Sequence, residues 1–233
     1  MANHKKYFMI LDTETCSDMV FDFGYVVIDR KGNKVAEGSF LCEEYMNHPE
    51  VLDMFNDPFT KTKIASYYFE LYKNSRAFEV MPFAEIRRTM NQVQQAFNAT
   101  VCAYNAAFDT NHLDKTARQF GYKKFFKGDV KYMDIWNMAL STLCNSRNYL
   151  KFCATHELWT AKGHPQTGAE AVYKYLMECP DFEEKHTARE DCEIEVYIFC
   201  RILRRKCKFD SDFVGMCLHN PYWKKICRRF EEF

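Results

Sequence analysis

Apolar residues near the start of the chain predict three strands in succession. The five residues from Tyr7 to Leu11 are all apolar, which is typical of a strand buried on both faces, and we predict this strand over residues 6–11. Stretches rich in aromatic and β-branched residues predict further strands over 23–29 and 34–41, joined by a tight turn over 30–33. Successive strands of this kind predict a meander that begins with the first strand.

After residue 43 the apolar residues recur at helical spacing. Three helices are predicted over 49–55, 61–73 and 82–97, and Pro82 is well placed to open the third. Short buried strands are expected over 100–104 and 131–133, each followed by a helix, and Asp134 is a candidate cap for the second of these helices. The later helices are predicted to end near residue 120 and to cover 135–144, the surroundings of 150–158, 169–177 and 187–206.

Strands first, followed by strands and helices in alternation, favour an α/β domain with a mixed sheet. At 233 residues the chain has room for one large domain or for one domain with a small extension. We expect the large domain over residues 1–208, with 209–233 as a C-terminal extension packed on it.

Composition narrows the class of protein. A chain that is 47% hydrophobic and 16% aromatic predicts a well-filled core and argues against disorder. Its formal net charge is zero, so a nucleic-acid partner would need a local basic patch or a metal ion. No apolar segment approaches the length of a membrane span and the N-terminus does not resemble a signal peptide, so we expect a soluble, cytoplasmic protein with no membrane partner.

The eleven cysteines contain no Cys-x-x-Cys pair, and several lie within apolar patterns. Free, buried thiols in a reducing compartment explain this better than a disulfide framework. A zinc site is an alternative, although its spacing fits no common zinc pattern. Its four ligands would be Cys207, Cys217, His219 and Cys227.

The first candidate site lies at the end of the first strand, at Asp12 and Glu14. A period of two places both carboxylates on one face of the strand, with Thr13 on the other. Two adjacent carboxylates repel each other, and a divalent metal ion between them would relieve the repulsion. The alternative is a solvated strand end.

Two later segments also carry acids at predicted element boundaries. Asp109 follows a buried strand, and His186 precedes Asp191 by five residues. Thr187 and Glu190 match a capping box, which would place His186 before the helix and Asp191 one turn inside it. A histidine on such a loop beside a fixed carboxylate suits a base over a metal site. Taken singly, the three residues could instead be a helix N-terminal acid, a surface histidine and one acid of an acidic stretch.

Together the three segments resemble the motifs of the DEDDh exonucleases, which belong to the DnaQ-like, ribonuclease-H-like group. The resemblance covers roughly residues 6–205, and Asp134 with Ile135 is a further echo of the family pattern. The matching segments are Asp12-Thr13-Glu14-Thr15 (Asp-x-Glu), Asn105-Ala106-Ala107-Phe108-Asp109 (Asn-x-x-Phe-Asp) and His186-Thr187-Ala188-Arg189-Glu190-Asp191 (His-x-Ala-x-x-Asp).

This resemblance implies a ribonuclease-H-like fold: a mixed five-stranded sheet flanked by helices, with a helical insertion before the second motif and a C-terminal helical extension. It also implies a metal-dependent 3′–5′ exonuclease that acts on the 3′ end of single-stranded DNA or RNA and releases nucleoside 5′-monophosphates. Two Mg²⁺ or Mn²⁺ ions would be held by four acids, with a histidine as the base and three neighbours in contact with substrate. These residues are Asp12, Glu14, Asp109 and Asp191 for the metals, His186 for the base, and Thr13, Asn105 and Phe108 for the substrate.

Two alternatives stay open: a nucleic-acid-binding module that kept the fold without catalysis, and a proofreading subunit of a polymerase. Basic and aromatic residues near the C-terminus suit a single strand, although a helix end and an amphipathic tail would show the same composition. They are Arg201, Arg204, Arg205, Lys206, Lys208, Lys224, Lys225, Arg228 and Arg229, interleaved near the end with Tyr222, Trp223 and Phe230.

Overall fold

The computed structural model describes residues 6–56, 63–74, 79–205 and 221–230. Its strands form a six-stranded sheet in the order β4-β3-β2-β1-β5-β6. Neighbouring pairs β1–β2 and β2–β3 are antiparallel and β3–β4 is parallel, so the sheet is mixed. The strands are β1 (Tyr7–Cys16), β2 (Met19–Asp29), β3 (Lys34–Cys42), β4 (Glu79–Met81), β5 (Thr100–Ala103) and β6 (Tyr132–Asp134).

The mixed α/β class is confirmed, and the sheet has one strand more than the five expected. The additional strand, β4, has three residues and pairs with the end of β3. The first strand is also longer than predicted: β1 continues through both acids of the first motif to Cys16. Antiparallel pairing with β2 along its whole length explains the extension, since ladder hydrogen bonds stabilise residues beyond the apolar run.

The helices follow the predicted segments closely. One difference is the segment predicted as a helix over 135–144, which is a short α-helix followed by a π-helical turn at Leu140–Cys144. The helices are α1 (Pro49–Asn56), α2 (Lys63–Asn74), α3 (Phe83–Phe97), α4 (Ala106–Gln119), α5 (Ile135–Ala139), α6 (Arg147–Thr155), α7 (Ala169–Met177), α8 (Ala188–Arg204) and α9 (Pro221–Phe230), with a 3₁₀ turn at Glu43–Tyr45.

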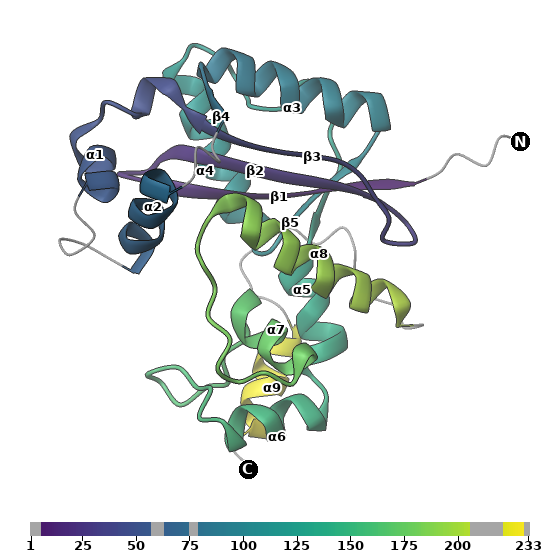
Figure 1. Ribbon diagram of the computed structural model, residues 1–233. Helices are drawn as coiled ribbons and strands as arrows, with labels where there is room; N and C mark the ends of the chain where they lie inside the picture. Colours follow the sequence, from purple (N-terminus) through teal and green to yellow (C-terminus); the bar gives the residue numbers. More distant parts are fainter. Residues whose placement is uncertain (1–5, 57–62, 75–78, 206–220, 231–233) are drawn as a thin grey trace, which may run out of the picture. The chain divides into compact units, whose positions relative to one another are not determined.

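The chain divides into two compact units. Unit 1 comprises residues 1–101, 108–131 and 185–193, and it contains the long strands β1 to β3. Met9, Ile10 and Leu11 in β1 are fully buried, as the apolar run predicted. An aromatic cluster joins α3 to the sheet, because the Phe83 ring lies 6.2 Å from the Phe23 ring of β2 between ring centroids. Phe83 also stacks on Phe120, just after α4, at 4.3 Å. Within this unit Figure 1 shows α1 and α2 as a pair of short helices near one end of the long strands.

Unit 2 comprises residues 102–107, 132–184 and 194–233, and its described part is mainly helical. Its core includes Tyr149 and Leu150 of α6, Ile198 of α8 and Ile226 of α9, all fully buried. The helix α9 packs against α6 and the π-helical turn, and Arg229 donates a hydrogen bond of 2.9 Å to the Asn145 side chain.

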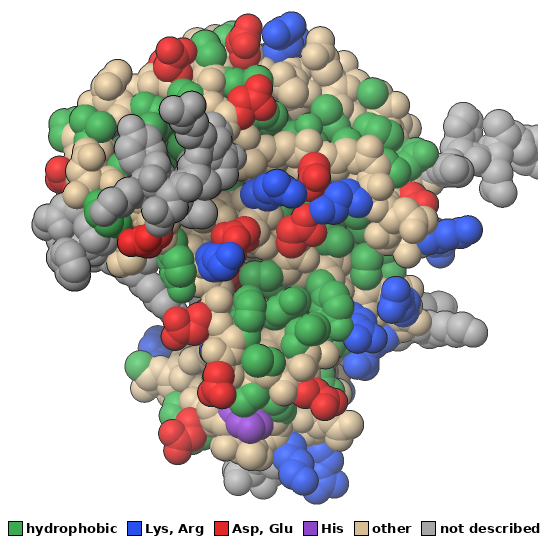
Figure 2. Space-filling view, in the orientation of Figure 1, with side chains coloured by type: hydrophobic (Ala, Val, Ile, Leu, Met, Phe, Trp, Pro, Cys, Tyr) green, Lys and Arg blue, Asp and Glu red, His purple; other side chains and the backbone are tan. Residues whose placement is uncertain are grey.

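Acidic and basic side chains are interspersed on the face shown in Figure 2, in keeping with the zero net charge. Within the described ranges, no helix is long and apolar enough to cross a lipid bilayer. The nine cysteines of the described residues are all free thiols. Three members of the alternative zinc set, Cys207, Cys217 and His219, lie outside the described residues, as do Lys206 and Lys208.

Candidate active site

The first-motif acids lie on one face of β1, directly opposite two residues of β2. In the strand register Asp12 faces Gly24 and Glu14 faces Asp22, so these four positions share a face of the sheet. The predicted period of two therefore holds through the motif. A shift in register between Glu14 and Thr15 then bends the strand just beyond the second acid.

The start of α8 lies against this face. A Cβ atom at Gly24 would come within 2.3 Å of the Ala188 carbonyl oxygen, so only glycine allows the approach. The neighbouring Asp22 accepts a hydrogen bond of 3.1 Å from the Ala188 backbone N–H. Position 188 is therefore fixed against β2 by both residues, and this placement carries the third motif to the acids of the first.

His186 lies two residues before this contact, outside the helix as predicted. Its backbone has a φ of 53°, a left-handed conformation that is uncommon for a residue with a side chain. The residues on either side of it are both bound by Glu190, which accepts from the Lys185 ammonium at 2.7 Å and from the Thr187 hydroxyl at 2.9 Å. Glu190 therefore holds the turn on which the His186 side chain is carried.

These contacts bring together three side chains of the types that bind metal ions. Ligand atoms of Glu14, His186 and Asp191 all lie within 4.8 Å of one another, and we call these three residues the Glu14–His186–Asp191 cluster. Asp191 is 6% exposed, while Glu14 and His186 are half-buried. Ligands about 2.1 Å from an octahedral Mg²⁺ ion stand up to roughly 4.2 Å apart, so the Glu14 and Asp191 carboxylates could bind one ion after small side-chain movements, with the His186 ring beside it. Its two carboxylates are the hard oxygen donors that Mg²⁺ and Mn²⁺ prefer.

Asp12 and Asp109 are not members of this three-residue group. Asp109 is 2% exposed in the first turn of α4, and its carboxylate accepts a hydrogen bond of 2.9 Å from the Thr13 hydroxyl. Two contacts hold α4 beside the β1–β2 turn: the Val20 N–H donates to the Thr116 hydroxyl, and Lys115 pairs with Asp18. Asp109 is therefore placed next to the first motif through Thr13.

The three predicted substrate residues occupy different settings. The Thr13 side chain is buried and bonded to Asp109, so its hydroxyl orients an acid. Phe108 is 42% exposed, with its ring 4.2 Å from the His112 ring. Asn105 belongs to unit 2, where it adopts a left-handed turn with a φ of 70°. Substrate contact by these residues stays a prediction.

Two further residues beside the cluster, Asp22 and Tyr68, belong to none of the three sequence motifs. Asp22 is fully buried in β2 and accepts from both the Ala188 N–H and the hydroxyl of Tyr68 in α2. Burial raises the pKa of Asp22 to about 6 despite these two donors. Burial and the neighbouring carboxylates Asp22, Glu14 and Asp191 hold the pKa of Tyr68 well above its usual range, which keeps its hydroxyl protonated as a donor. The adjacent Tyr67 ring lies 6.3 Å from the His186 ring.

In unit 2, Asp134 is likewise a buried acid that accepts from a backbone N–H of a motif segment, as Asp22 does in unit 1. It caps α5, as predicted, by accepting from the Asn137 N–H at 2.9 Å. Its second oxygen accepts from the Ala106 N–H at 3.1 Å, next to Asn105 of the second motif. The residue is 1% exposed, and burial raises its pKa to about 6.

No family model matches the chain. The search of curated proteins also found no match to its sequence. Among solved structures, E. coli exonuclease I in complex with a 5cy-dT13 oligonucleotide is similar at a TM-score of 0.52 and 13% identity, over 85% of this chain and 42% of the exonuclease chain. Its complex with a dA16 oligonucleotide gives a TM-score of 0.55 at 13% identity, over 87% and 41% of the two chains.

A 3′-exonuclease that recognises the 3′ end of the histone mRNA stem-loop is also similar, with a TM-score of 0.53 and 11% identity over 89% of this chain and 67% of that one. The present chain thus spans about two fifths of the length of the exonuclease I structures. At these identities the comparisons establish a common fold. The chain has the α/β fold of these exonucleases, and its Glu14–His186–Asp191 cluster is built on that fold.

Proposed function

We propose that the protein is a metal-dependent 3′–5′ exonuclease that removes nucleoside 5′-monophosphates from the 3′ end of single-stranded DNA or RNA. The observation that carries the proposal is the Glu14–His186–Asp191 cluster, because two carboxylates and an imidazole from distant segments converge within 4.8 Å. The fold similarity to exonucleases solved with oligonucleotides supports the same reading. The left-handed backbone of His186 also supports the proposal, since backbone strain of this kind clusters at functional sites.

Glu14 and Asp191 would hold a divalent ion, and Asp12 and Asp109 on the neighbouring segments would complete a two-ion site. Bound there, Mg²⁺ or Mn²⁺ would neutralise phosphate charge and lower the pKa of a bound water. Through their fixed positions on β1 and α8, Glu14 and Asp191 would set where a cation is held, and so where the negatively charged phosphodiester can bind. Thr13 would keep the Asp109 carboxylate aimed by its hydrogen bond of 2.9 Å.

His186 would take the proton from the attacking water at a ring nitrogen. Glu190 and the contact of Ala188 with Asp22 hold the turn before α8, so the backbone that carries the His186 ring is fixed. Mg²⁺ prefers oxygen ligands, which leaves the imidazole available as the proton acceptor. Phe108, exposed at the start of α4, offers a face on which the terminal base could stack.

The test is digestion of a 5′-labelled single-stranded oligonucleotide with Mg²⁺ or Mn²⁺, comparing wild type with Glu14→Gln and Asp191→Asn. Each amide removes a ligand charge with little change in shape, and we expect turnover to fall by more than the roughly 10–100-fold usual for losing a residue that only supports a metal ligand. Glu193→Gln is the matched control, because Glu193 lies on the same helix and pairs with Lys34. EDTA should also abolish turnover.

Full activity of both amide variants, or of wild type in EDTA, would contradict the proposal. Tight oligonucleotide binding by wild type without any turnover would instead identify a non-catalytic nucleic-acid-binding module. DNA and RNA substrates should be run side by side, since contacts to the 2′-hydroxyl decide that preference.

A further inference from the structure

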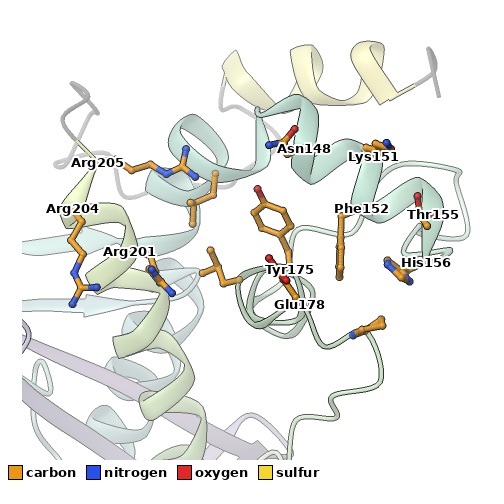
Figure 3. A pocket seen from close by; sticks show the side chains of 13 residues that line it. Asn148, Lys151, Phe152, Thr155, His156, Tyr175, Glu178, Arg201, Arg204 and Arg205 are labelled. Atoms are coloured by element: carbon orange, nitrogen blue, oxygen red, sulfur yellow. The ribbon is translucent and has the colours of Figure 1, made fainter.

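Unit 2 contains a cavity of about 770 Å³ between α6, α7 and the C-terminal end of α8, which we call the α6–α8 pocket. This volume lies within the roughly 300–1,000 Å³ usual for ligand sites. Figure 3 shows side chains from all three helices directed around it. None of its lining residues belongs to the Glu14–His186–Asp191 cluster, and the proposed reaction uses none of them.

The charge of the pocket is strongly positive. Its lining includes four cationic side chains, Lys151, Arg201, Arg204 and Arg205, and one acidic side chain, Glu178. Figure 2 shows basic side chains gathered over the C-terminal end of α8. Such a concentration of cations in a protein of zero net charge indicates an anionic ligand.

Two of the arginines are held in place, and neither forms an ion pair with an acid in the part of the chain that the structure describes. Arg205 donates to the Thr142 carbonyl at 2.9 Å, and Arg201 donates to the Tyr197 hydroxyl at 2.6 Å. Both acceptors are uncharged oxygens, so the guanidinium groups keep their charge for a ligand. Guanidinium groups fixed in this way match the geometry of phosphate oxygens.

Aromatic side chains divide the cations into two groups. In the view of Figure 3, Tyr175 lies between the three arginines of α8 and the α6 side chains that include Lys151 and Phe152. Tyr175 and Phe152 are half-buried, and their ring centroids lie 5.5 Å apart. Phosphates on either side of a stacked base are the pattern that a single strand presents, whereas a small inorganic anion needs no aromatic ring.

We propose that the α6–α8 pocket is a second nucleic-acid site that binds the phosphate backbone and a base of a single strand. The choice of polyanion rests on the proposed function, since an exonuclease must hold a strand beyond its reacting end. Arg201, Arg204 and Arg205 would contact phosphates on one side, Lys151 would do so on the other, and Tyr175 with Phe152 would support a base.

The experiment measures binding of a fluorescent dT oligonucleotide to the full chain in EDTA, as a function of salt. The variant Lys151→Ala/Arg204→Ala removes one exposed cation from each side of the pocket. Each phosphate contact adds about 0.7 to the salt slope for a single strand, so the slope should become shallower by about 1.4. The control Arg147→Ala/Lys162→Ala removes the same charge from exposed positions of unit 2 outside the pocket and should leave the slope unchanged.

An unchanged slope in the pocket variant, or an equal change in the control, would overturn the proposal. Competition with dTMP and inorganic phosphate separates the possible anions: the oligonucleotide should displace the probe at concentrations where both small anions fail. Equal displacement by dTMP would assign the pocket to a mononucleotide and contradict binding of a strand. Because binding is measured without metal, its outcome is independent of whether wild type cleaves the strand.

Discussion

Two buried aspartates, one in each unit, anchor the segments that carry the second and third motifs. Asp22 in unit 1 accepts from the Ala188 N–H, two residues after His186, and Asp134 in unit 2 accepts from the Ala106 N–H, next to Asn105. Burial raises the pKa of each to about 6. Each acid therefore has an energetic cost when ionised, and each lies outside the motif that it positions.

The two anchors differ in what they join. Asp22 receives its donors on one oxygen, from α8 and from the Tyr68 hydroxyl of the helical insertion, so it couples the insertion to the third motif. Asp134 divides its backbone donors between two oxygens and joins the second-motif turn to the start of α5. The helical insertion therefore reaches the site through one side chain, that of Tyr68. Asp134 accepts from backbone N–H groups, which do not depend on the side chain at the donor position.

We call the hydrogen bond from the Ala188 N–H to Asp22 the Asp22 anchor, and that from the Ala106 N–H to Asp134 the Asp134 anchor. Of the effects in this comparison, the largest is expected from removing the His186 side chain, whose turn the Asp22 anchor holds. His186→Ala should lower the rate of strand cleavage by about 10²–10⁴-fold, the usual contribution of a positioned proton acceptor. Single-turnover cleavage with saturating enzyme measures this rate apart from binding. His164→Ala, a change of the same kind in unit 2, is the control and should cleave normally. A His186→Ala protein that cleaves within a few fold of wild type would show that the anchored turn has another purpose.

Breaking the Asp22 anchor itself should destabilise the fold. Asp22→Ala leaves the Ala188 N–H and the Tyr68 hydroxyl buried without their acceptor, at about 1–3 kcal/mol for each. Asp22→Asn keeps one oxygen for both donors and removes a carboxylate whose burial raises its pKa to about 6, so near neutral pH it should be at least as stable as wild type. Chemical denaturation of the two variants measures the difference.

The cleavage rate of the folded Asp22 variants separates positioning from bulk stability. We expect kcat to fall in Asp22→Ala with little change in KM, because His186 moves while the strand still binds. Recovery of kcat in Asp22→Asn would support the anchor. Equal kcat in the alanine variant and wild type, measured where both are folded, would exclude it.

The strands and the motifs could be predicted because both depend on local pattern. Alternation placed Asp12 and Glu14 on one face, and the capping pair Thr187 and Glu190 placed His186 outside α8, as the structure has them. The three-residue strand β4 was missed because it is too short for a periodic signal, and the π-helical turn has an apolar pattern that an α-helix would share.

The Asp22 anchor could not be predicted from sequence. Asp22 lies in an apolar strand, where a single acid gives no indication of its partner, and its contacts come from residues 46 and 166 positions away. Gly24 shows the same limit: its role depends on the approach of the Ala188 carbonyl, which only the folded chain reveals. Asp134 was partly predictable, because capping of α5 is local, while its bond to Ala106 is not.

The smallest effect should come from the Asp134 anchor, and it depends on pH. Because the folded pKa is about 6 and the ordinary value is 3.8, folding takes up a proton between these values and the free energy of unfolding falls as the pH rises. From pH 4.5 to 7 this loss amounts to about 2 kcal/mol. Asp134→Asn removes this titration. Its amide oxygen can accept only one of the two N–H groups that the carboxylate binds, so the variant loses one hydrogen bond at every pH. Its free energy of unfolding relative to that of wild type should then rise by about 2 kcal/mol from pH 4.5 to 7.

Urea denaturation of both proteins at several pH values measures this difference. The acid contributes no catalytic group in the proposed reaction, so the variant should gain stability relative to wild type as the pH rises, without the loss of kcat expected for Asp22→Ala. A difference in unfolding free energy between Asp134→Asn and wild type that stays constant with pH would show that the pKa of Asp134 in the folded protein equals its ordinary value. The two anchors would then differ in charge state as well as in partners, since Asp22 alone would carry the cost of burial.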